Sequence, residues 1–118
     1  MRILLADDQA KVRFALRVLL EQQPGLEIMA ETTDGESLLA QVQAGCPDLV
    51  LLDWELPSPE VQQLLPALRR ACPDLLVIAL SGRPEVRPVA LAAGADDFVC
   101  KCDPPERLLA AIAAARHE

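Results

Sequence analysis

The sequence lacks the features that mark several common classes of protein. Although 52% of the 118 residues are hydrophobic, no apolar run approaches the roughly 18 residues of a membrane-spanning helix. No signal peptide is indicated, because Met1 and Arg2 lead directly into a short predicted strand. Basic residues number 11 against 18 acidic ones, and a net charge of −7 makes the chain a poor partner for a phosphate backbone. We therefore expect a cytoplasmic protein that binds no membrane and does not itself bind nucleic acid.

Cysteine and histidine, which are common zinc ligands, are also few. The cysteines are Cys46, Cys72, Cys100 and Cys102, and His117 is the single histidine. No Cys-x-x-Cys pair is present, so a structural zinc site is not expected. We expect free, mostly buried thiols in a reducing cytosol. A disulfide between Cys100 and Cys102 is disfavoured, because alternate residues of an extended segment are awkward to bridge.

Five short stretches of the sequence are predicted to be β-strands. Three are continuous apolar runs bounded by turn residues, which is typical of strands buried on both faces of a parallel sheet: residues 3–6, 49–52 and 75–80. Residues 95–100, which end in a fourth short apolar run, are the fifth predicted strand. Residues 26–31 instead alternate apolar and charged side chains, which suits a half-exposed edge strand.

Helices are predicted after each of these strands. Apolar residues at helical spacing, with Asp34 and Asp103 as N-caps and Pro104 as a first helical residue, predict helices over 11–21, 34–45, 60–71 and 103–115. The stretch 82–88 contains two prolines, so a helix there would be short and begin at one of them. Strict alternation of strand and helix predicts one α/β domain over residues 1–118, with a doubly wound, five-stranded parallel sheet.

Polar residues follow the predicted buried strands. Asp7 and Asp8 follow the first, Asp53 the third and Ser81 the fourth, and Lys101 lies just beyond the last. Right-handed crossovers leave the carboxyl ends of parallel strands on one edge of the sheet, so these side chains are expected to meet there. Carboxylates about 4 Å apart repel by about 4 kcal/mol per pair at an effective dielectric constant near 20. A divalent cation and the Lys101 ammonium are the candidates to offset that repulsion.

Each of these residues also has an ordinary alternative role. An acidic residue at the end of a strand is often a solvated turn residue, and a loop serine such as Ser81 often bonds to its own backbone. Phe98 is as well suited to core packing as to a functional role. The convergence of three acids favours a site, as does the use of lysine at only Lys11 and Lys101 among eleven basic residues.

Three segments, in order and at matching spacing, resemble the receiver domain of two-component response regulators. They are Leu-Leu-Ala-Asp7-Asp8, Leu-Val-Leu-Leu-Asp53-Trp-Glu-Leu-Pro57 and Gly94-Ala-Asp-Asp-Phe-Val-Cys-Lys101. The resemblance covers essentially the whole chain and implies a flavodoxin-like (βα)5 fold with strand order 2-1-3-4-5. Residues 9–13 and 30–35 look most like receivers of the LuxR/NarL type, which precede a DNA-binding helix-turn-helix domain.

The resemblance also implies a site for phosphoryl transfer. Asp53 would accept a phosphoryl group from a sensor histidine kinase. Mg²⁺ would be held by carboxylates of Asp7, Asp8 and Asp53 and by the backbone carbonyl of Glu55, because this ion prefers oxygen ligands. Catalysis would come from positioning and charge neutralisation, since a carboxylate is a weak nucleophile.

Lys101, Ser81 and Phe98 would complete a phosphorylation switch. Lys101 and Ser81 would contact phosphoryl oxygens, and Phe98 would rotate into the space that Ser81 vacates. Such a domain phosphorylates and dephosphorylates itself and is not a turnover enzyme. The signal would pass through a homodimer, or to DNA through an output domain outside this chain, in regulation of transcription.

Two departures from the family pattern leave an alternative open. Cys102 stands where the family usually has proline after a cis peptide, and a cis bond to a non-proline residue costs about 3–4 kcal/mol, so a trans or a strained cis peptide is expected. The segment 81–101 is also slightly shorter than is common. A receiver-like interaction module whose output is independent of phosphate is therefore the second hypothesis. An aspartate-based phosphatase fits poorly, because Glu55 stands at its second acidic position.

Overall fold

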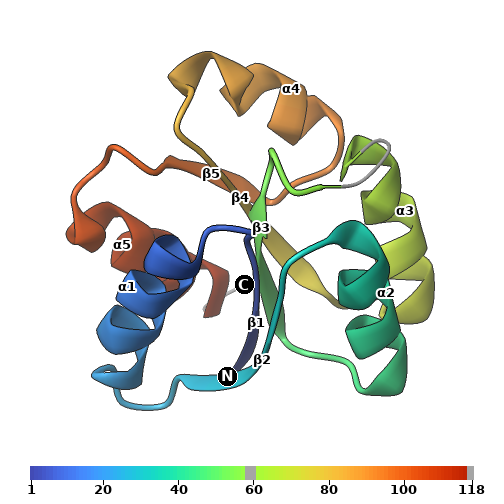
Figure 1. Cartoon of the computed structure of the whole chain (residues 1–118), viewed down its shortest axis with the longest axis horizontal. Coiled ribbons are helices and arrows are strands. Elements are labelled where there is room, and N and C mark those ends of the chain that lie inside the picture. Colours follow the sequence, from blue (N-terminus) through green and yellow to red (C-terminus); the bar gives the residue numbers. More distant parts are fainter. Residues whose placement is uncertain (58–60, 117–118) are drawn as a thin grey trace.

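Five parallel strands form a sheet at the centre of the computed structural model, which describes residues 1–57 and 61–116 (Figure 1). The strand order is β2-β1-β3-β4-β5 and every neighbouring pair is parallel, as predicted. The strands are β1 Arg2–Ala6, β2 Glu27–Thr32, β3 Leu49–Asp53, β4 Leu76–Ser81 and β5 Asp97–Cys100. The half-exposed strand predicted near residues 26–31 is β2, and it lies at an edge of the sheet.

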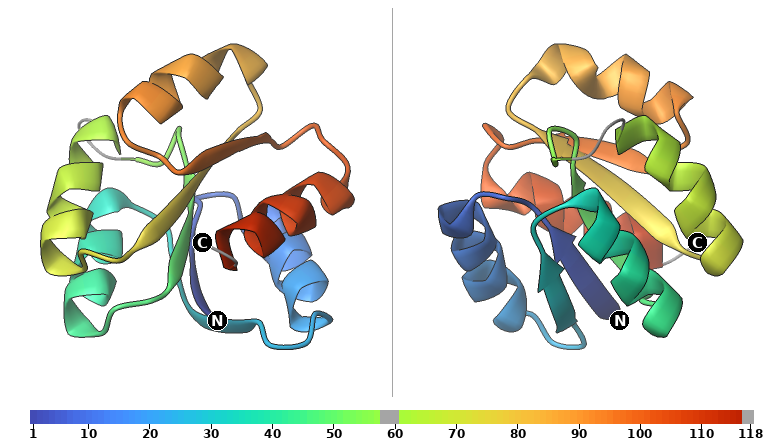
Figure 2. Two further views of the ribbon diagram at one scale, coloured as in Figure 1. Left: turned by 180° about the vertical axis from the view of Figure 1, so that it is seen from behind. Right: turned by 45° about the vertical axis from the view of Figure 1, so that its right-hand side comes forward.

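Helices cover both faces of this sheet, so the doubly wound fold is confirmed (Figure 2). Helices α1 and α5 pack on one face, and α2, α3 and α4 pack on the other. The helices are α1 Ala10–Glu21, α2 Gly35–Ala44, α3 Val61–Ala71, α4 Arg87–Ala92 and α5 Pro105–Arg116, with a 3-10 turn η1 Pro84–Val86 before α4. The predicted first residue of the third helix, Glu60, lies outside the described residues, as does His117.

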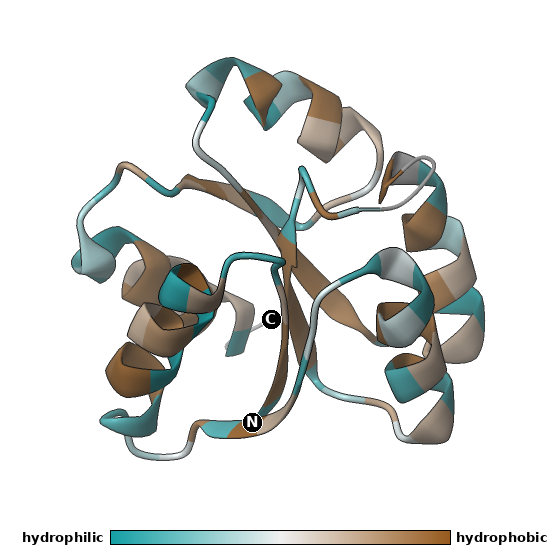
Figure 3. Ribbon diagram, in the orientation of Figure 1, coloured by the Kyte–Doolittle hydropathy of each residue, from teal (hydrophilic) through white to brown (hydrophobic). Residues whose placement is uncertain are grey.

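The central strands are apolar on both faces because each face is covered by helices. In β1, Ile3 and Leu5 pack toward α1 and α5, whereas Leu4 and Ala6 pack toward α2 and α3. All of β3 is buried, and full burial of one such leucine contributes roughly 1.5–3 kcal/mol. The hydropathy colouring in Figure 3 shows this apolar centre between helices with hydrophilic outer faces.

The helix starts follow the local sequence, with one correction. Asp34 caps α2 as predicted, because its carboxylate accepts a hydrogen bond from Ser37 N at 2.7 Å. Asp103 does not cap α5, which begins two residues later at Pro105. The reason is the double proline: a residue that precedes proline avoids the helical conformation, so Pro104 cannot serve as a first helical residue. The Asp103 carboxylate accepts instead from Cys100 N at 3.1 Å.

The region between β4 and β5 is short, as its prolines predict. η1 begins at Pro84, and α4 carries a proline in its first turn. β5 begins two residues later than predicted. Asp96 precedes it as a turn residue whose carboxylate accepts from Val77 N and from Arg69 Nη2, at 2.8 and 2.9 Å. No helix that the structure describes is long and apolar enough to cross a membrane.

The expectation of free thiols is wrong, because the four cysteines form two disulfides. Cys46 pairs with Cys72, with Cα atoms 5.8 Å apart, since they follow the adjacent ends of α2 and α3. Cys100 pairs with Cys102, with Cα atoms 5.1 Å apart. The chain turns immediately after Cys100 and does not stay extended, which brings alternate residues together. The described residues contain no cis peptide, so the bond before Cys102 is trans, one of the two expected forms.

Both ends of the described chain lie on the amino-terminal side of the sheet (Figure 1). The Met1 ammonium donates a hydrogen bond to Gly25 O at 2.7 Å. Arg116, the last residue of α5, lies over Gly25 closely enough that a Cβ atom there would come within 2.8 Å of its Nη2. Gly25 also has a φ of +81°, which favours glycine. The turn before β2 is therefore bonded to the first residue of the chain and lies close to the last residue of α5.

Candidate functional site

Three aspartates meet at the carboxyl ends of β1 and β3. Asp7 and Asp8 follow β1 directly and Asp53 ends β3, and one oxygen of each lies within 4.8 Å of the others. Asp7 and Asp53 are 1% and 2% exposed, whereas Asp8 is exposed to solvent. The structure thus gathers the three acids that the sequence placed at strand ends.

Backbone hydrogen bonds orient the two buried carboxylates. Gln9 N donates to Asp7 Oδ1 at 2.9 Å, and Glu55 N donates to Asp53 Oδ1 at 3.0 Å. The turn after β3 is held to β4 by a bond of 2.8 Å from Trp54 N to Leu80 O. Each carboxylate is therefore fixed by the loop that follows its own strand.

The Lys101 ammonium lies between the two buried acids. Its Nζ is 2.7 Å from Asp7 Oδ2 and 3.3 Å from Asp53 Oδ1, and the side chain is 20% exposed. The backbone N of Lys101 donates to Ser81 O at 2.8 Å, which ties the end of β5 to β4. Burial by itself would lower the pKa of Lys101, but the hydrogen bond to Asp7 and the negative charges of Asp53 and Asp7 outweigh it and raise the pKa.

Asp53 titrates unusually for an aspartate. Burial, and to a lesser extent the charge of Asp7, raise its pKa from 3.8 to about 6, against the lowering effects of the Glu55 N–H and Lys101. The carboxylate is therefore ionised above about pH 6 and takes up a proton below it.

Ser81 is fully buried and bonds to a side chain that the sequence did not single out. Its Oγ donates to Glu55 Oε1 at 2.7 Å and accepts from Arg83 N at 3.0 Å. The Arg83 guanidinium lies 3.8 Å from Glu55 Oε2. Sequence reasoning considered only the backbone carbonyl of Glu55, since nothing in the spacing indicates that its carboxylate turns toward β4.

Phe98 points into the core on the α4 side of the sheet and is 3% exposed. It packs in the same cluster as Val86 and Ala90, which come from η1 and α4. Its backbone carbonyl accepts hydrogen bonds from Arg87 and Arg107, at 3.1 and 3.3 Å. The structure therefore shows this ring in a buried position, with both flanking helices anchored to its backbone.

The three aspartates suit a hard divalent cation. They offer carboxylate oxygens only, which Mg²⁺ and Ca²⁺ prefer over nitrogen or sulfur. Asp7 Oδ2 is buried, with the Lys101 ammonium 2.7 Å away. Three carboxylates that share one ammonium keep a net negative charge, so the donor set fits a metal ion.

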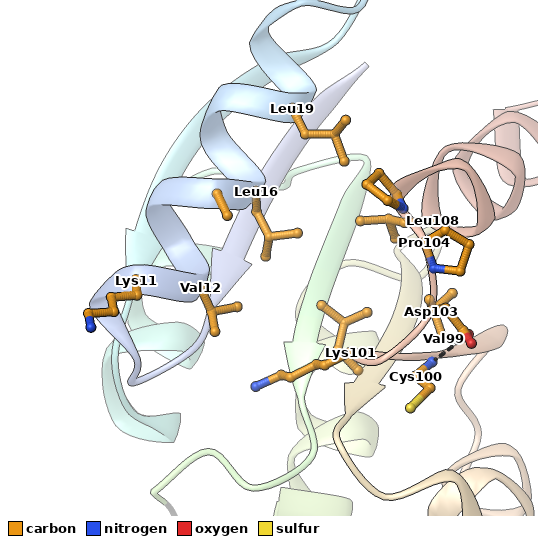
Figure 4. A pocket seen from close by; sticks show the side chains of 13 residues that line it. Lys11, Val12, Leu16, Leu19, Val99, Cys100, Lys101, Asp103, Pro104 and Leu108 are labelled. Carbon is orange, nitrogen blue, oxygen red and sulfur yellow. Dashed lines mark hydrogen bonds between the residues drawn. The ribbon is translucent and has the colours of Figure 1, made fainter.

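An apolar cavity of about 350 Å³ lies next to Lys101, between α1 and α5 (Figure 4). Val12, Leu16 and Leu19 line it from α1, and Leu108 lines it from α5. The Lys101 side chain crosses the end of the sheet beside this cavity. Lys101 is therefore shared by the apolar cavity and the acidic site, whereas Asp7, Asp8 and Asp53 do not line the cavity.

Comparisons with known proteins agree with this geometry. The family model of the response regulator receiver domain matches residues 3–113. The phosphate regulon transcriptional regulatory protein PhoB of Klebsiella pneumoniae is 37% identical over 117 residues, which cover 96% of this chain and 50% of PhoB. This chain therefore spans about half the length of that relative.

Solved structures show the same architecture. A two-component response regulator of the LuxR family from Aurantimonas sp. SI85-9A1 has a TM-score of 0.87 at 30% identity, covering 96% of this chain and 82% of that one. The response regulator domain of Thermotoga maritima CheB has a TM-score of 0.87 at 24% identity, covering 100% and 97%, and supports the fold alone. The family match over residues 3–113 shows that this chain belongs to the response regulator receiver domain family.

Proposed function

We propose that residues 1–118 form a single receiver domain that accepts a phosphoryl group on Asp53 from a sensor histidine kinase. The observation that carries this proposal is the contact of one ammonium, that of Lys101, with both Asp7 and Asp53 inside a cluster of three aspartates. Such a cluster combines a nucleophile, cation ligands and a fixed positive charge at one edge of the sheet.

The chemistry requires an ionised Asp53. Its carboxylate oxygen attacks phosphorus as the bond from phosphorus to the donor nitrogen breaks, and that nitrogen takes a proton. Asp53 is ionised above about pH 6, so transfer should proceed near neutral pH. When bound, Mg²⁺ would neutralise charge on the phosphoryl oxygens, and Asp7, Asp8, Asp53 and the backbone carbonyl of Glu55 are the residues that would hold it.

Lys101 and Ser81 have new partners once the phosphoryl group is attached. The Lys101 ammonium, now 3.3 Å from Asp53 Oδ1, would pair with a phosphoryl oxygen as a compact charge. The Ser81 hydroxyl would exchange its bond to Glu55 for another phosphoryl oxygen. Movement of Ser81 would then let Phe98 rotate into the vacated space, which would bias the surface formed by α4, β5 and α5.

The wider role follows from the relatives. PhoB is a transcriptional regulatory protein, and this chain matches half of its length. We infer that this receiver works in the cytoplasm as a self-phosphorylating and self-dephosphorylating switch without enzymatic turnover. It would act through a homodimer or through a DNA-binding output domain outside the described chain.

The test is direct. Incubation with Mg²⁺ and acetyl phosphate should add about 80 Da, the mass of one phosphoryl group, measured by intact-protein mass spectrometry. Asp53→Asn should give no adduct, and removal of Mg²⁺ by a chelator should suppress it. A wild-type protein that remains unmodified with Mg²⁺ would refute the proposal.

One contact and one buried side chain favour a second function. Glu55 already holds the Ser81 hydroxyl, and Phe98 is already buried. Both features suit an interaction module whose surface does not respond to phosphate. Hydrogen exchange around Ser81 and Phe98, measured with and without Mg²⁺ and beryllofluoride, separates the two: a clear change supports the switch, and identical exchange supports the module.

A further inference from the structure

We propose that Cys100 and Cys102 form a reversible thiol–disulfide site, reduced by dithiols, that sets the position of Lys101. The exchange between thiols and disulfide does not depend on the proposed function. Its effect on Mg²⁺ binding rests on the proposed cation site at the aspartates. The two sulfurs belong to the residues on either side of the lysine that contacts Asp7 and Asp53.

The disulfide closes a small covalent ring that contains the whole backbone of Lys101. The chain turns between the two cysteines, whose Cα atoms are 5.1 Å apart. Hydrogen bonds fix the same segment, from Lys101 N to Ser81 O at 2.8 Å and from Cys100 N to Asp103 Oδ2 at 3.1 Å. With the ring closed, the backbone of Lys101 is held in place, and so is the base of the side chain that carries the ammonium.

The two sulfurs are suited to different parts of an exchange reaction. Cys102 is exposed and Cys100 is 5% exposed, so a thiolate from solvent reaches Cys102 Sγ first. The backbone N–H of Cys102 points to Cys100 Sγ at 3.3 Å, where it would stabilise the negative charge of a leaving thiolate. Exposed disulfides are in general the labile ones.

The reaction balances with a dithiol as the reductant. One thiolate of the dithiol attacks Cys102 Sγ, the bond to Cys100 Sγ breaks, and Cys100 leaves as a thiolate that takes a proton. The second sulfur of the dithiol then attacks the mixed disulfide and releases Cys102. The dithiol is oxidised to a disulfide, and its two electrons and two protons end on the two cysteines; the oxidised dithiol drives the reverse reaction.

Opening the ring should change cation binding at the aspartates. In the closed ring, the ammonium is held against oxygens of Asp7 and Asp53 that belong to the candidate metal site. Once the backbone of Lys101 is released, its side chain can withdraw from those oxygens. We expect reduction to strengthen Mg²⁺ binding by about five-fold or more, the lower end of ordinary coupling between two sites.

The second disulfide provides a matched control. Cys46 is exposed and Cys72 is buried, so this pair also has one accessible half. It lies before β3 and β4, at the amino ends of strands whose carboxyl ends carry Asp53 and Ser81. Cys46→Ser removes that bond far from Lys101, and Cys102→Ser removes the ring around it.

The experiment equilibrates the full chain and both variants with mixtures of reduced and oxidised dithiothreitol. Thiols are trapped by alkylation and assigned by peptide mass, and the Mg²⁺ dissociation constant is read from the fluorescence of Trp54, the single tryptophan. The wild-type protein and Cys46→Ser should open and close the Cys100–Cys102 pair reversibly. Their Mg²⁺ dissociation constants should fall with reduction, whereas Cys102→Ser should show one value throughout.

Two results would overturn the inference: a pair that stays open under every oxidising mixture, or a Mg²⁺ affinity that is the same with the pair open and closed. Dithiol can also open the Cys46–Cys72 pair, so Cys46→Ser assigns the change in Mg²⁺ affinity to the Cys100–Cys102 pair. Should that variant be unstable, peptide mass reports the two pairs separately in the wild-type protein, and its Mg²⁺ affinity is compared with the state of the Cys100–Cys102 pair alone. Failure of the proposed function has a different signature. It would appear as a redox-dependent Mg²⁺ affinity with no acetyl phosphate adduct in either state.

Discussion

Single side chains around Asp53 satisfy one another's charges and hydrogen bonds. Lys101 is shared by Asp7 and Asp53, and the Ser81 hydroxyl is bound to Glu55. A phosphoryl group that arrives on Asp53 must therefore displace contacts within the protein as well as water. The balance between these contacts and the new ones sets the response, because a ligand shifts a two-state equilibrium only by its difference in affinity for the two states.

Glu55 should slow the modification of Asp53. Its carboxylate competes for the Ser81 hydroxyl, but the side chain is 41% exposed, so we take only about 1 kcal/mol from a hydrogen bond to a charged group. Glu55→Ala should then accelerate modification by acetyl phosphate about five-fold, as followed by mass spectrometry over time. Glu36→Ala, which removes a glutamate from the first turn of α2, is the control. An unchanged or slower rate would show that this hydrogen bond does not limit the reaction.

Asp53 should destabilise the fold at neutral pH. Its pKa is raised from 3.8 to about 6, so the folded state favours the protonated form, and that stabilisation is lost as pH rises from about 4 through about 6. Asp53→Asn, a neutral mimic, should therefore raise the free energy of unfolding by about 1–3 kcal/mol at pH 8. Urea denaturation at several pH values measures this, and the gain should shrink toward pH 4. A gain independent of pH would assign the effect to packing.

At the scale of helices and strands, local sequence patterns predicted most of the fold. The apolar runs and the Asp34 cap correctly predicted the buried strands and α2, because buried strands and caps depend on neighbouring residues. The strand order, also correct, was implied by the family resemblance. The boundary errors fall where a nearby residue overrides the pattern. Pro105 delays α5, and Asp96 delays β5 by bonding to Val77 N from a turn.

Helix α3 contains an unfavourable residue that can be replaced. Pro66 lies inside the helix and its side chain is exposed, so it removes a backbone donor and contributes little packing. Pro66→Ala should raise the free energy of unfolding by about 1–3 kcal/mol in urea denaturation. Pro105→Ala should change it by less than about 0.5 kcal/mol, because proline is well tolerated at the first residue of a helix. Equal effects of the two substitutions would contradict this account of α3.

At the scale of the whole molecule, contacts between distant residues complete the site and the covalent framework. Topology brought Asp7, Asp53 and Lys101 to one edge, which the order of strands made predictable. The Glu55–Ser81 bond and the Cys46–Cys72 pair could not be predicted in this way. Both depend on the directions of side chains and on how two loops or helices meet. The two residues of each pair are 26 positions apart in the sequence, and that spacing does not indicate whether their side chains meet.

The Cys46–Cys72 disulfide should stabilise the domain as a whole. A cross-link over 26 residues reduces the conformational entropy of the unfolded chain by an amount worth about 3.5 kcal/mol. Cys46→Ser should lower the free energy of unfolding by about that much in urea without a reductant. Cys102→Ser, which opens a ring around one residue, should lower it far less. With an excess of dithiol, the wild-type protein should match Cys46→Ser, and persistence of a large difference would contradict the entropic explanation.

The position of Arg116 close to Gly25 has a geometric consequence. Helix α5 runs back across the sheet and ends at the pole opposite Asp53, next to the chain's own amino group. A polypeptide segment attached after α5 would thus start on the side of the domain opposite Asp53. A conformational change caused by modification of Asp53 would have to be transmitted through α5, or through the surfaces beside it, to reach such a segment.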